Sequence, residues 1–203
     1  MEDVEGNCVD WRSIANTEAP GMAASLEIHL EDSYHAVEPP GRWPMYITPP
    51  CALAVGELLR KLQSANVHAT WYVVGDFAKK APALIEQIVA AGHQLGSHGY
   101  WHRRGESEGD CGDSATRRLL PHCVGYRSPF WIHTPRPGMA GGVFFRTLPY
   151  ALLKREIQRH QLLYLHPHDF FPSEKPWRRR IFLCDPWKRL QRLLTELDWH
   201  DPR

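Results

Sequence analysis

Residues 68–102 read HATWYVVGDFAKKAPALIEQIVAAGHQLGSHGYWH and alternate between two patterns of apolar residues. Ala69–Val74 is β-branched and aromatic, which predicts a buried strand. Pro82–Ala91 has a proline in its first turn and is followed by Gly92, as is typical of a helix. Gln94–Ser97 predicts another short strand. Helix and strand spacing of this kind predicts parallel βα units.

Elements of the same two kinds flank this stretch. Ala24–Leu30 predicts a short strand that ends at polar Glu31-Asp32, and Pro49-Pro50 is expected to break the chain before a helix over residues 52–64. Further along, the patterns predict a polar surface loop over 103–118, a strand over Val124–Ser128, a loop over 132–142, a helix over Leu148–His160, a strand over Leu162–Leu165 and a helix over Pro186–Leu197. We therefore expect an α/β domain over residues 24–203, after an irregular segment over residues 1–23.

The composition narrows the classes of partner. The 203 residues carry 24 Lys and Arg against 23 Asp and Glu, a balance that argues against nucleic acid or a membrane surface as the main partner. No apolar stretch approaches the ~18 residues that span a bilayer. The first residues, MEDVEGNCVDWRSIANTEAP, lack the basic start and apolar core of a secretory signal, so the expected compartment is the cytoplasm. The oligomeric state is not predicted.

The cysteine pattern argues against a disulfide framework and against a cysteine zinc knuckle, because the number is odd and no C-x-x-C pair occurs. The expected state is a set of free thiols. The five cysteines are Cys8, Cys51, Cys111, Cys123 and Cys184.

Polar clusters follow three of the predicted strands, at Glu31-Asp32, at residues 97–102 and at residues 165–169. The carboxyl ends of parallel strands are where α/β folds build their sites. His98 and His102 are spaced i, i+4, so on one helical turn both imidazoles would point the same way and could bind one metal; the alternative is a pair of surface or core-edge histidines. A carboxylate from another strand end would complete an open, catalytic type of site.

The motifs resemble those of a known family. Beside residues 68–102, the resemblance rests on EIHLEDSYH at 27–35, VGYRSPFW at 124–131, GGVFFRTLPY at 141–150 and YLHPHDF at 164–170. The chain resembles the NodB-like polysaccharide deacetylases of carbohydrate esterase family 4. Within that family it is most similar to the branch at exopolysaccharide loci that accompanies exosortase systems. The resemblance implies an α/β fold built as a partial or irregular (β/α) barrel.

The resemblance also implies an activity. It implies a hydrolase that removes N-acetyl groups from an amino-sugar polysaccharide or oligosaccharide by means of metal-activated water. Its metal ligands would be Asp32, His98 and His102, which would hold a divalent ion, usually Zn²⁺ in this family. Glu31 would be the general base, and His166 would protonate the leaving amine.

Supporting roles follow from the same resemblance. Arg127 would orient the base, and Tyr126 and Trp131 would line the sugar groove. Independently of the resemblance, His168 and Asp169 are expected either to orient His166 or to lie in a loop.

The sequence departs from the family pattern in two places. His29 stands where the branch usually has an acidic residue; if that acid is the base, Glu31 becomes a metal ligand instead, and His29 becomes a base or a ligand. Ile132–Ala140 spans an interval where relatives carry several tens of residues, so the chain is expected to be shortened in the middle. The alternative function is therefore a shortened, non-catalytic homologue that binds metal or glycan without turnover.

Overall fold

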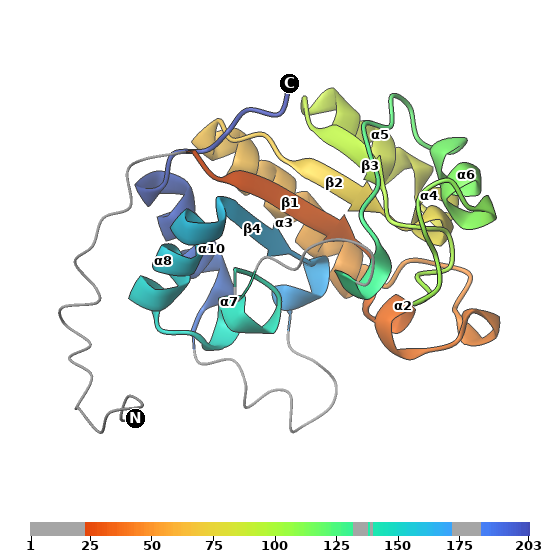
Figure 1. Cartoon of the computed structure of the whole chain (residues 1–203), viewed down its shortest axis with the longest axis horizontal. Coiled ribbons are helices and arrows are strands. Elements are labelled where there is room, and N and C mark those ends of the chain that lie inside the picture. The colour runs from red at the N-terminus through yellow and green to blue at the C-terminus, as the bar shows by residue number, and fades with distance from the viewer. Residues whose placement is uncertain (1–22, 132–137, 139, 172–183) are drawn as a thin grey trace.

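The computed structural model describes residues 23–131, 138, 140–171 and 184–203, and a parallel sheet forms its centre (Figure 1). The strands are β1 (Ser25–Leu30), β2 (Thr70–Val73), β3 (Gln94–Ser97) and β4 (Leu162–Leu165), in the order β3-β2-β1-β4. Each neighbouring pair is parallel. The predicted α/β class and the partial barrel are confirmed. Because β1 lies between β2 and β4, the two halves of the chain meet at it.

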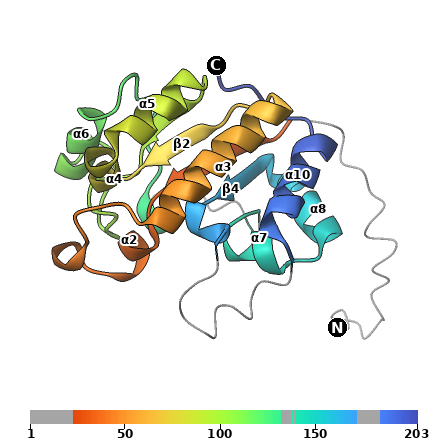
Figure 2. The same cartoon turned by 180° about the vertical axis from the view of Figure 1, so that it is seen from behind.

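Helices pack on this sheet. The long helix α3 (Pro49–Ala65) crosses behind the sheet in Figure 1 and in front of it in Figure 2, and it contacts α5 (Pro82–Ala90) and α10 (Pro186–Glu196). The remaining elements are α2 (Ser33–Val37), η1 (Pro40–Arg42), α4 (Gly75–Lys80), α6 (Cys111–Arg117), η2 (Pro129–Trp131), α7 (Val143–Thr147), α8 (Tyr150–His160) and η3 (Pro167–Asp169).

The ends of α3 explain one wrong expectation. Pro49 and Pro50 do not precede the helix but form its first turn. A proline fits there because the first N–H groups of a helix have no partner within it. At the other end, Asn66 takes a left-handed conformation (φ 52°), and its N–H group bonds to the carbonyls of Leu62 and Gln63.

Strand β1 separates the core from the site. Leu26, Ile28 and Leu30 are buried in the hydrophobic core. The residues that alternate with them, Glu27 and His29, are buried and polar. Since successive side chains of a strand point to opposite faces, β1 presents an apolar face to the core and a polar face to the site.

Most predicted elements are present with slightly different bounds. The loop expected over residues 103–118 contains α6, which begins at an N-cap where Asp110 accepts a hydrogen bond from the backbone N–H of Asp113 (2.8 Å). The strand expected over Val124–Ser128 is wrong: the structure has one isolated bridge there, between Ser97 and Tyr126. Helices α2, α4 and α7 were not predicted.

Several other expectations can be placed. Within the described ranges, Cys51, Cys111, Cys123 and Cys184 are free, as predicted, whereas Cys8 lies outside them. The irregular segment expected over residues 1–23 and the shortened interval at Ile132–Ala140 lie largely outside the described residues. Among the described helices, none combines the length and the apolarity that crossing a bilayer requires.

Candidate functional site

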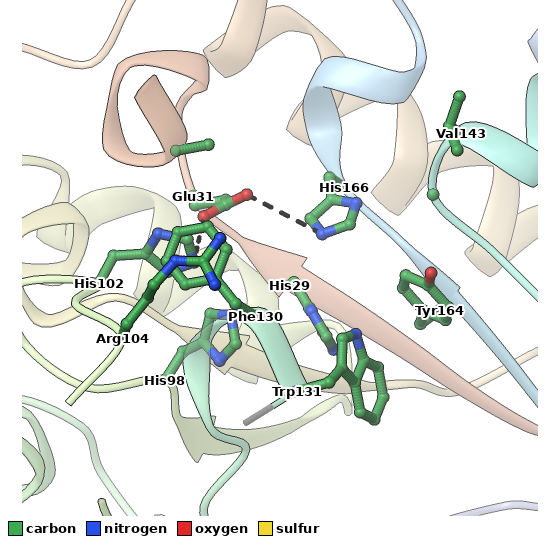
Figure 3. Close-up of a pocket in the computed structure, with 12 residues that line it drawn as sticks. His29, Glu31, His98, His102, Arg104, Phe130, Trp131, Val143, Tyr164 and His166 are labelled. Atoms are coloured by element: carbon green, nitrogen blue, oxygen red, sulfur yellow. Dashed lines mark ion pairs between the residues drawn. The ribbon is translucent and has the colours of Figure 1, made fainter. Parts of the chain in front are cut away.

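The polar clusters after β1, β3 and β4 surround one cavity of about 450 Å³ (Figure 3). Glu31 follows β1, His98 follows β3 and His166 follows β4, so the predicted meeting of strand ends is confirmed. The cavity is lined by His29, Glu31, Ala36, His98, His102, Arg104, Phe130, Trp131, Gly142, Val143, Tyr164 and His166.

Three buried side chains at this cavity form a candidate metal-binding group. One ligand atom each from Glu31, His98 and His102 lies within 4.8 Å of the others. Oε2 of Glu31 is 2.7 Å from Nε2 of His102. Two imidazoles and one carboxylate are ligands that suit Zn²⁺ and related divalent ions.

Backbone carbonyls fix the orientation of both imidazoles. Nδ1 of His98 donates to the carbonyl oxygen of Arg127 (2.6 Å), and Nδ1 of His102 donates to that of His35 (3.2 Å). With Nδ1 protonated, Nε2 of each ring is the atom available to a ligand. Metal-binding histidines are commonly held in this way.

Asp32, which was expected to join these histidines, lies elsewhere. Its Oδ1 accepts hydrogen bonds from the backbone N–H of Ser33 (2.7 Å) and from Oγ1 of Thr48 (3.0 Å), and its Oδ2 accepts from the backbone N–H of Thr48 (2.6 Å). The Asp32 carboxylate is therefore the N-cap of α2, and it also holds Thr48, the residue that precedes α3, by hydrogen bonds. Glu31, and not Asp32, therefore lies with the two histidines, as in the alternative arrangement in which Glu31 is a metal ligand; the roles of ligand and base stay predictions.

The loop from His98 to His102 is not the helical turn that their spacing indicated. Gly99 has φ +72°, and a Cβ atom there would lie 2.8 Å from Oε2 of Glu106. The buried Glu106 carboxylate accepts hydrogen bonds from the backbone N–H groups of Tyr100 (2.7 Å), Trp101 (2.9 Å) and Arg103 (2.6 Å). Glu106 thus shapes the loop that places both histidines. Its role is not predictable from the sequence, because nothing distinguishes Glu106 from the other acidic residues of a polar segment.

The side chain of His166 is held by Asp169. Oδ2 of Asp169 accepts from the backbone N–H of His166 (2.9 Å) and from its Nδ1 (3.1 Å). Burial alone would lower the pKa of His166, but the Asp169 hydrogen bond and charge raise it. Burial alone would raise the pKa of Asp169, but His166 and the neighbouring cations lower it to about 2. Of the two alternatives for Asp169, the structure shows the one in which it orients His166.

Burial and the Glu31–His102 pair set the charge states at the centre of the site. Burial alone would raise the pKa of Glu31, but the imidazole of His102 holds it well below its usual range. Burial lowers the pKa of His98 and of His29 well below the usual value. Burial alone would lower the pKa of His102, but the charge and hydrogen bond of Glu31 raise it, so metal binding would displace a proton from this imidazole.

Arg127 does not contact the expected base. Its guanidinium pairs with the carboxylate of Glu27, through Nε to Oε2 at 3.0 Å and through a closer contact from Nη2 to Oε1. It also lies over the rings of Tyr72 and Trp131. Oε2 of Glu27 is in turn 3.7 Å from Nε2 of His29. Arg127 therefore supports the β1 face that carries His29, rather than Glu31 itself.

Of the two aromatic residues expected at the sugar groove, the cavity lining includes Trp131 and not Tyr126. The indole of Trp131 packs 5.2 Å from the ring of His29 and 5.1 Å from that of Tyr164. Phe130 and Trp131 both have positive φ, 57° and 59°. Consecutive bulky residues in this region cost roughly 1–3 kcal/mol each, which marks the cavity wall as a strained segment. Phe130 and Tyr164, which were not predicted as site residues, also line the cavity.

Part of the chain matches a known family in sequence. Residues 50–118 match the family model described as polysaccharide deacetylase. An 83-residue segment is 32% identical to the peptidoglycan-N-acetylglucosamine deacetylase of Bacillus cereus, and the match covers 39% of this chain and 30% of that relative. The chain thus corresponds to less than a third of the length of this curated relative.

Solved structures share the fold. A peptidoglycan deacetylase from Bacillus subtilis has a TM-score of 0.55 at 11% identity, over 89% of this chain and 87% of that one. A mutant of a CE4 family pseudoenzyme from Bacillus anthracis, with restored enzymatic activity, has a TM-score of 0.56 at 14% identity. The match covers 88% of this chain and 63% of that one. At these identities the structures show the fold alone. The chain thus resembles polysaccharide deacetylases in sequence over residues 50–118 and shares the fold of these solved structures.

Proposed function

We propose that this chain is a metal-dependent hydrolase that removes N-acetyl groups from an amino-sugar polysaccharide, with Glu31, His98 and His102 as the ligands of its metal ion. The observation that carries the proposal is the buried group of these three side chains at the end of the parallel sheet. The family match over residues 50–118 supports the reaction class.

The donor set fits a catalytic divalent ion, and Zn²⁺ is the metal we propose. Three protein ligands leave coordination positions open for water and substrate, which distinguishes catalytic from structural zinc sites. Oε2 of Glu31 is buried and, among the described residues, has no well-directed hydrogen bond, although Nε2 of His102 is 2.7 Å away. Both residues belong to the group whose ligand atoms lie within 4.8 Å of one another. When bound, such an ion polarises the amide carbonyl and lowers the pKa of its water.

The chain's own residues would move the protons. Nε2 of His166 lies 3.9 Å from Oε1 of Glu31 at the cavity, while Asp169 holds Nδ1 and raises the pKa of the ring. His166 can therefore carry a proton near neutral pH and give it to the leaving amine. With Glu31 among the ligands, His29 is the group on the same face of β1 that is placed to accept the proton from water.

The aromatic wall would bind the sugar. Trp131 and Tyr164 line one side of the cavity, and Arg104 lies over Phe130 (4.9 Å) at another. Flat apolar rings with polar edges suit the faces of a pyranose. The sequence resemblance favours an exopolysaccharide or its precursor as substrate. The name of the Bacillus cereus relative favours peptidoglycan.

Acetate release tests the proposal. Zinc-loaded wild-type protein, the His98→Gln variant and the His200→Gln variant would each be incubated with N-acetylglucosamine oligomers, with peptidoglycan and with an N-acetylated exopolysaccharide. His200 is an exposed histidine and serves as the matched control. We expect release by wild type and His200→Gln, and a rate lower by about 100-fold or more in His98→Gln. Zinc binding without release from any of the three substrates would contradict the proposal and favour a non-catalytic homologue.

A further inference from the structure

We propose a second divalent-metal pocket next to the first, formed by Glu31, His166 and His168. One ligand atom from each of these residues lies within 4.8 Å of the others. Oε1 of Glu31 is 3.9 Å from Nε2 of His166 and 3.9 Å from Nδ1 of His168. Both imidazole nitrogens thus lie near Oε1 of Glu31, whereas Oε2 of the same carboxylate faces His102.

The arrangement of His168 is that of a ligand. Its Nδ1 is buried and, in the described part of the chain, has no hydrogen-bond partner. Its ring stacks on that of His166, with centroids 4.7 Å apart and an angle of 16° between the planes. A stack alone would not require both rings to turn a nitrogen toward the same carboxylate oxygen. A buried, unpaired imidazole nitrogen costs free energy unless it acquires a partner, and a metal ion supplies one.

Asp169 orients His166 in the second pocket. Backbone carbonyls orient His98 and His102 in the first pocket in the same way. Oδ2 of Asp169 accepts the hydrogen bond from Nδ1 of His166, which leaves Nε2 as the atom that faces Glu31. A carboxylate behind a histidine is a common outer partner of metal ligands, because it fixes the tautomer and raises the basicity of the ring.

The carboxylate of Glu31 joins the two pockets. Oε2 faces His102, and Oε1 faces His166 and His168. One carboxylate can bridge two ions, and two-metal sites typically hold their ions ~3.5–4 Å apart. Two imidazoles in the second pocket favour ions such as Zn²⁺ or Co²⁺ over Mg²⁺ or Ca²⁺, which prefer oxygen ligands.

Occupation of the second pocket has a consequence for the reaction. An ion there takes Nε2 of His166, the atom that gives a proton to the leaving amine. The inference rests on the proposed function for this consequence and for the shared Glu31. We therefore expect the first equivalent of metal to activate the protein and the second to inhibit it.

Titration of Co²⁺ into the metal-free protein tests the pocket, because the visible absorption of Co²⁺ reports binding independently of activity. Wild type, His98→Gln, His168→Gln and the exposed-site control His200→Gln would be compared. We expect two equivalents in wild type and His200→Gln. His168→Gln should weaken the second event by at least about tenfold and leave the first within about twofold, and it should remove inhibition by excess metal. Circular dichroism checks folding, and His168→Asn replaces the glutamine variant if that one is unfolded.

The outcomes separate the two proposals. A single equivalent in wild type that His98→Gln removes would overturn the second pocket and leave the proposed function standing. Two equivalents that both survive His168→Gln and His168→Asn would also overturn it. A single event that only the His168 variants remove would support the pocket and contradict the ligand set of the proposed function.

Discussion

Glu31 and His102 meet at the end of β1, where Oε2 of the carboxylate lies 2.7 Å from Nε2 of the imidazole. Glu31 follows directly after the strand, and His102 lies in the loop between β3 and α6. Glu27 and His29 precede Glu31 by four and two residues, so they lie on the same face of β1 as Glu31, and both are buried. The neighbouring Asp32 is directed away and holds α2 and α3. The centre of the site therefore follows from the alternation of β1.

Replacing Asp32 with alanine should destabilise the protein without removing its metal ligands. The change deletes an N-cap acceptor and the hydrogen bonds to Thr48, and we expect a loss of about 1–3 kcal/mol in the free energy of unfolding. Urea denaturation measures it. The matched control is Asp198→Ala at an exposed position, for which we expect a change within about 0.5 kcal/mol. Equal stability of the two variants would contradict the capping role.

Removing the charge of Arg127 should destabilise the fold through Glu27. The Glu27 side chain is 9% exposed, and burial raises its pKa even though Arg127 opposes this. Arg127→Met leaves that carboxylate buried and unpaired, which costs about 3–5 kcal/mol in comparable cases. The double variant Glu27→Gln/Arg127→Met should recover much of the loss in the same denaturation experiment. A double variant no more stable than Arg127→Met alone would argue against this pairing.

Trp131 should contribute to substrate binding rather than to chemistry. Its indole lines the cavity beside His29 and Tyr164 but lies outside the Glu31, His98 and His102 group. Trp131→Ala should raise KM for an N-acetylglucosamine oligomer by about tenfold and change kcat by less than about threefold. Trp131→Phe should keep most of the affinity. A fall in kcat at unchanged KM would assign the residue to the reaction step instead.

Stability should decrease at acidic pH because of His93. Its Nδ1 accepts a hydrogen bond from the backbone N–H of Ala69 (3.2 Å), and burial, with the charges of His68 and Arg203, lowers its pKa from 6.5 to about 4. Between these two values the unfolded chain binds more protons at this residue than the folded one. The free energy of unfolding therefore falls as the pH drops through this window. Denaturation at about pH 7 and about pH 4.5 should show a smaller fall in His93→Gln than in wild type, whereas identical falls would contradict the assignment.

The sequence predicted the sheet well because its strands carry strong local signals. Buried parallel strands form short apolar runs, and the run expected at Leu162–Leu165 has the same bounds as β4. The face of the sheet on which Glu31 lies could also be predicted from the sequence. Leu26, Ile28 and Leu30 occupy the core face of β1, so counting in twos puts Glu31 on the other face together with His29.

Other parts of the site depend on contacts that no local pattern contains. Arg127 and Glu27 are 100 residues apart in the sequence, and their pairing follows only from the assembled sheet. The spacing of His98 and His102 indicated a helical turn. Their true arrangement instead requires the positive φ of Gly99 and three backbone hydrogen bonds to Glu106. Helix spacing predicts a shared direction only where a helix forms.

The most direct test of the central claim is acetate release by Glu31→Gln and Asp32→Asn, each loaded with one equivalent of Zn²⁺ and shown by circular dichroism to be folded. The geometry predicts that the rate of acetate release by Glu31→Gln is lower than that of wild type by about 100-fold or more, because the variant loses a proposed metal ligand. The rate of Asp32→Asn should stay within about tenfold of the wild-type rate. Retention of activity in Glu31→Gln, with its loss in a folded Asp32→Asn, would contradict the proposed metal site.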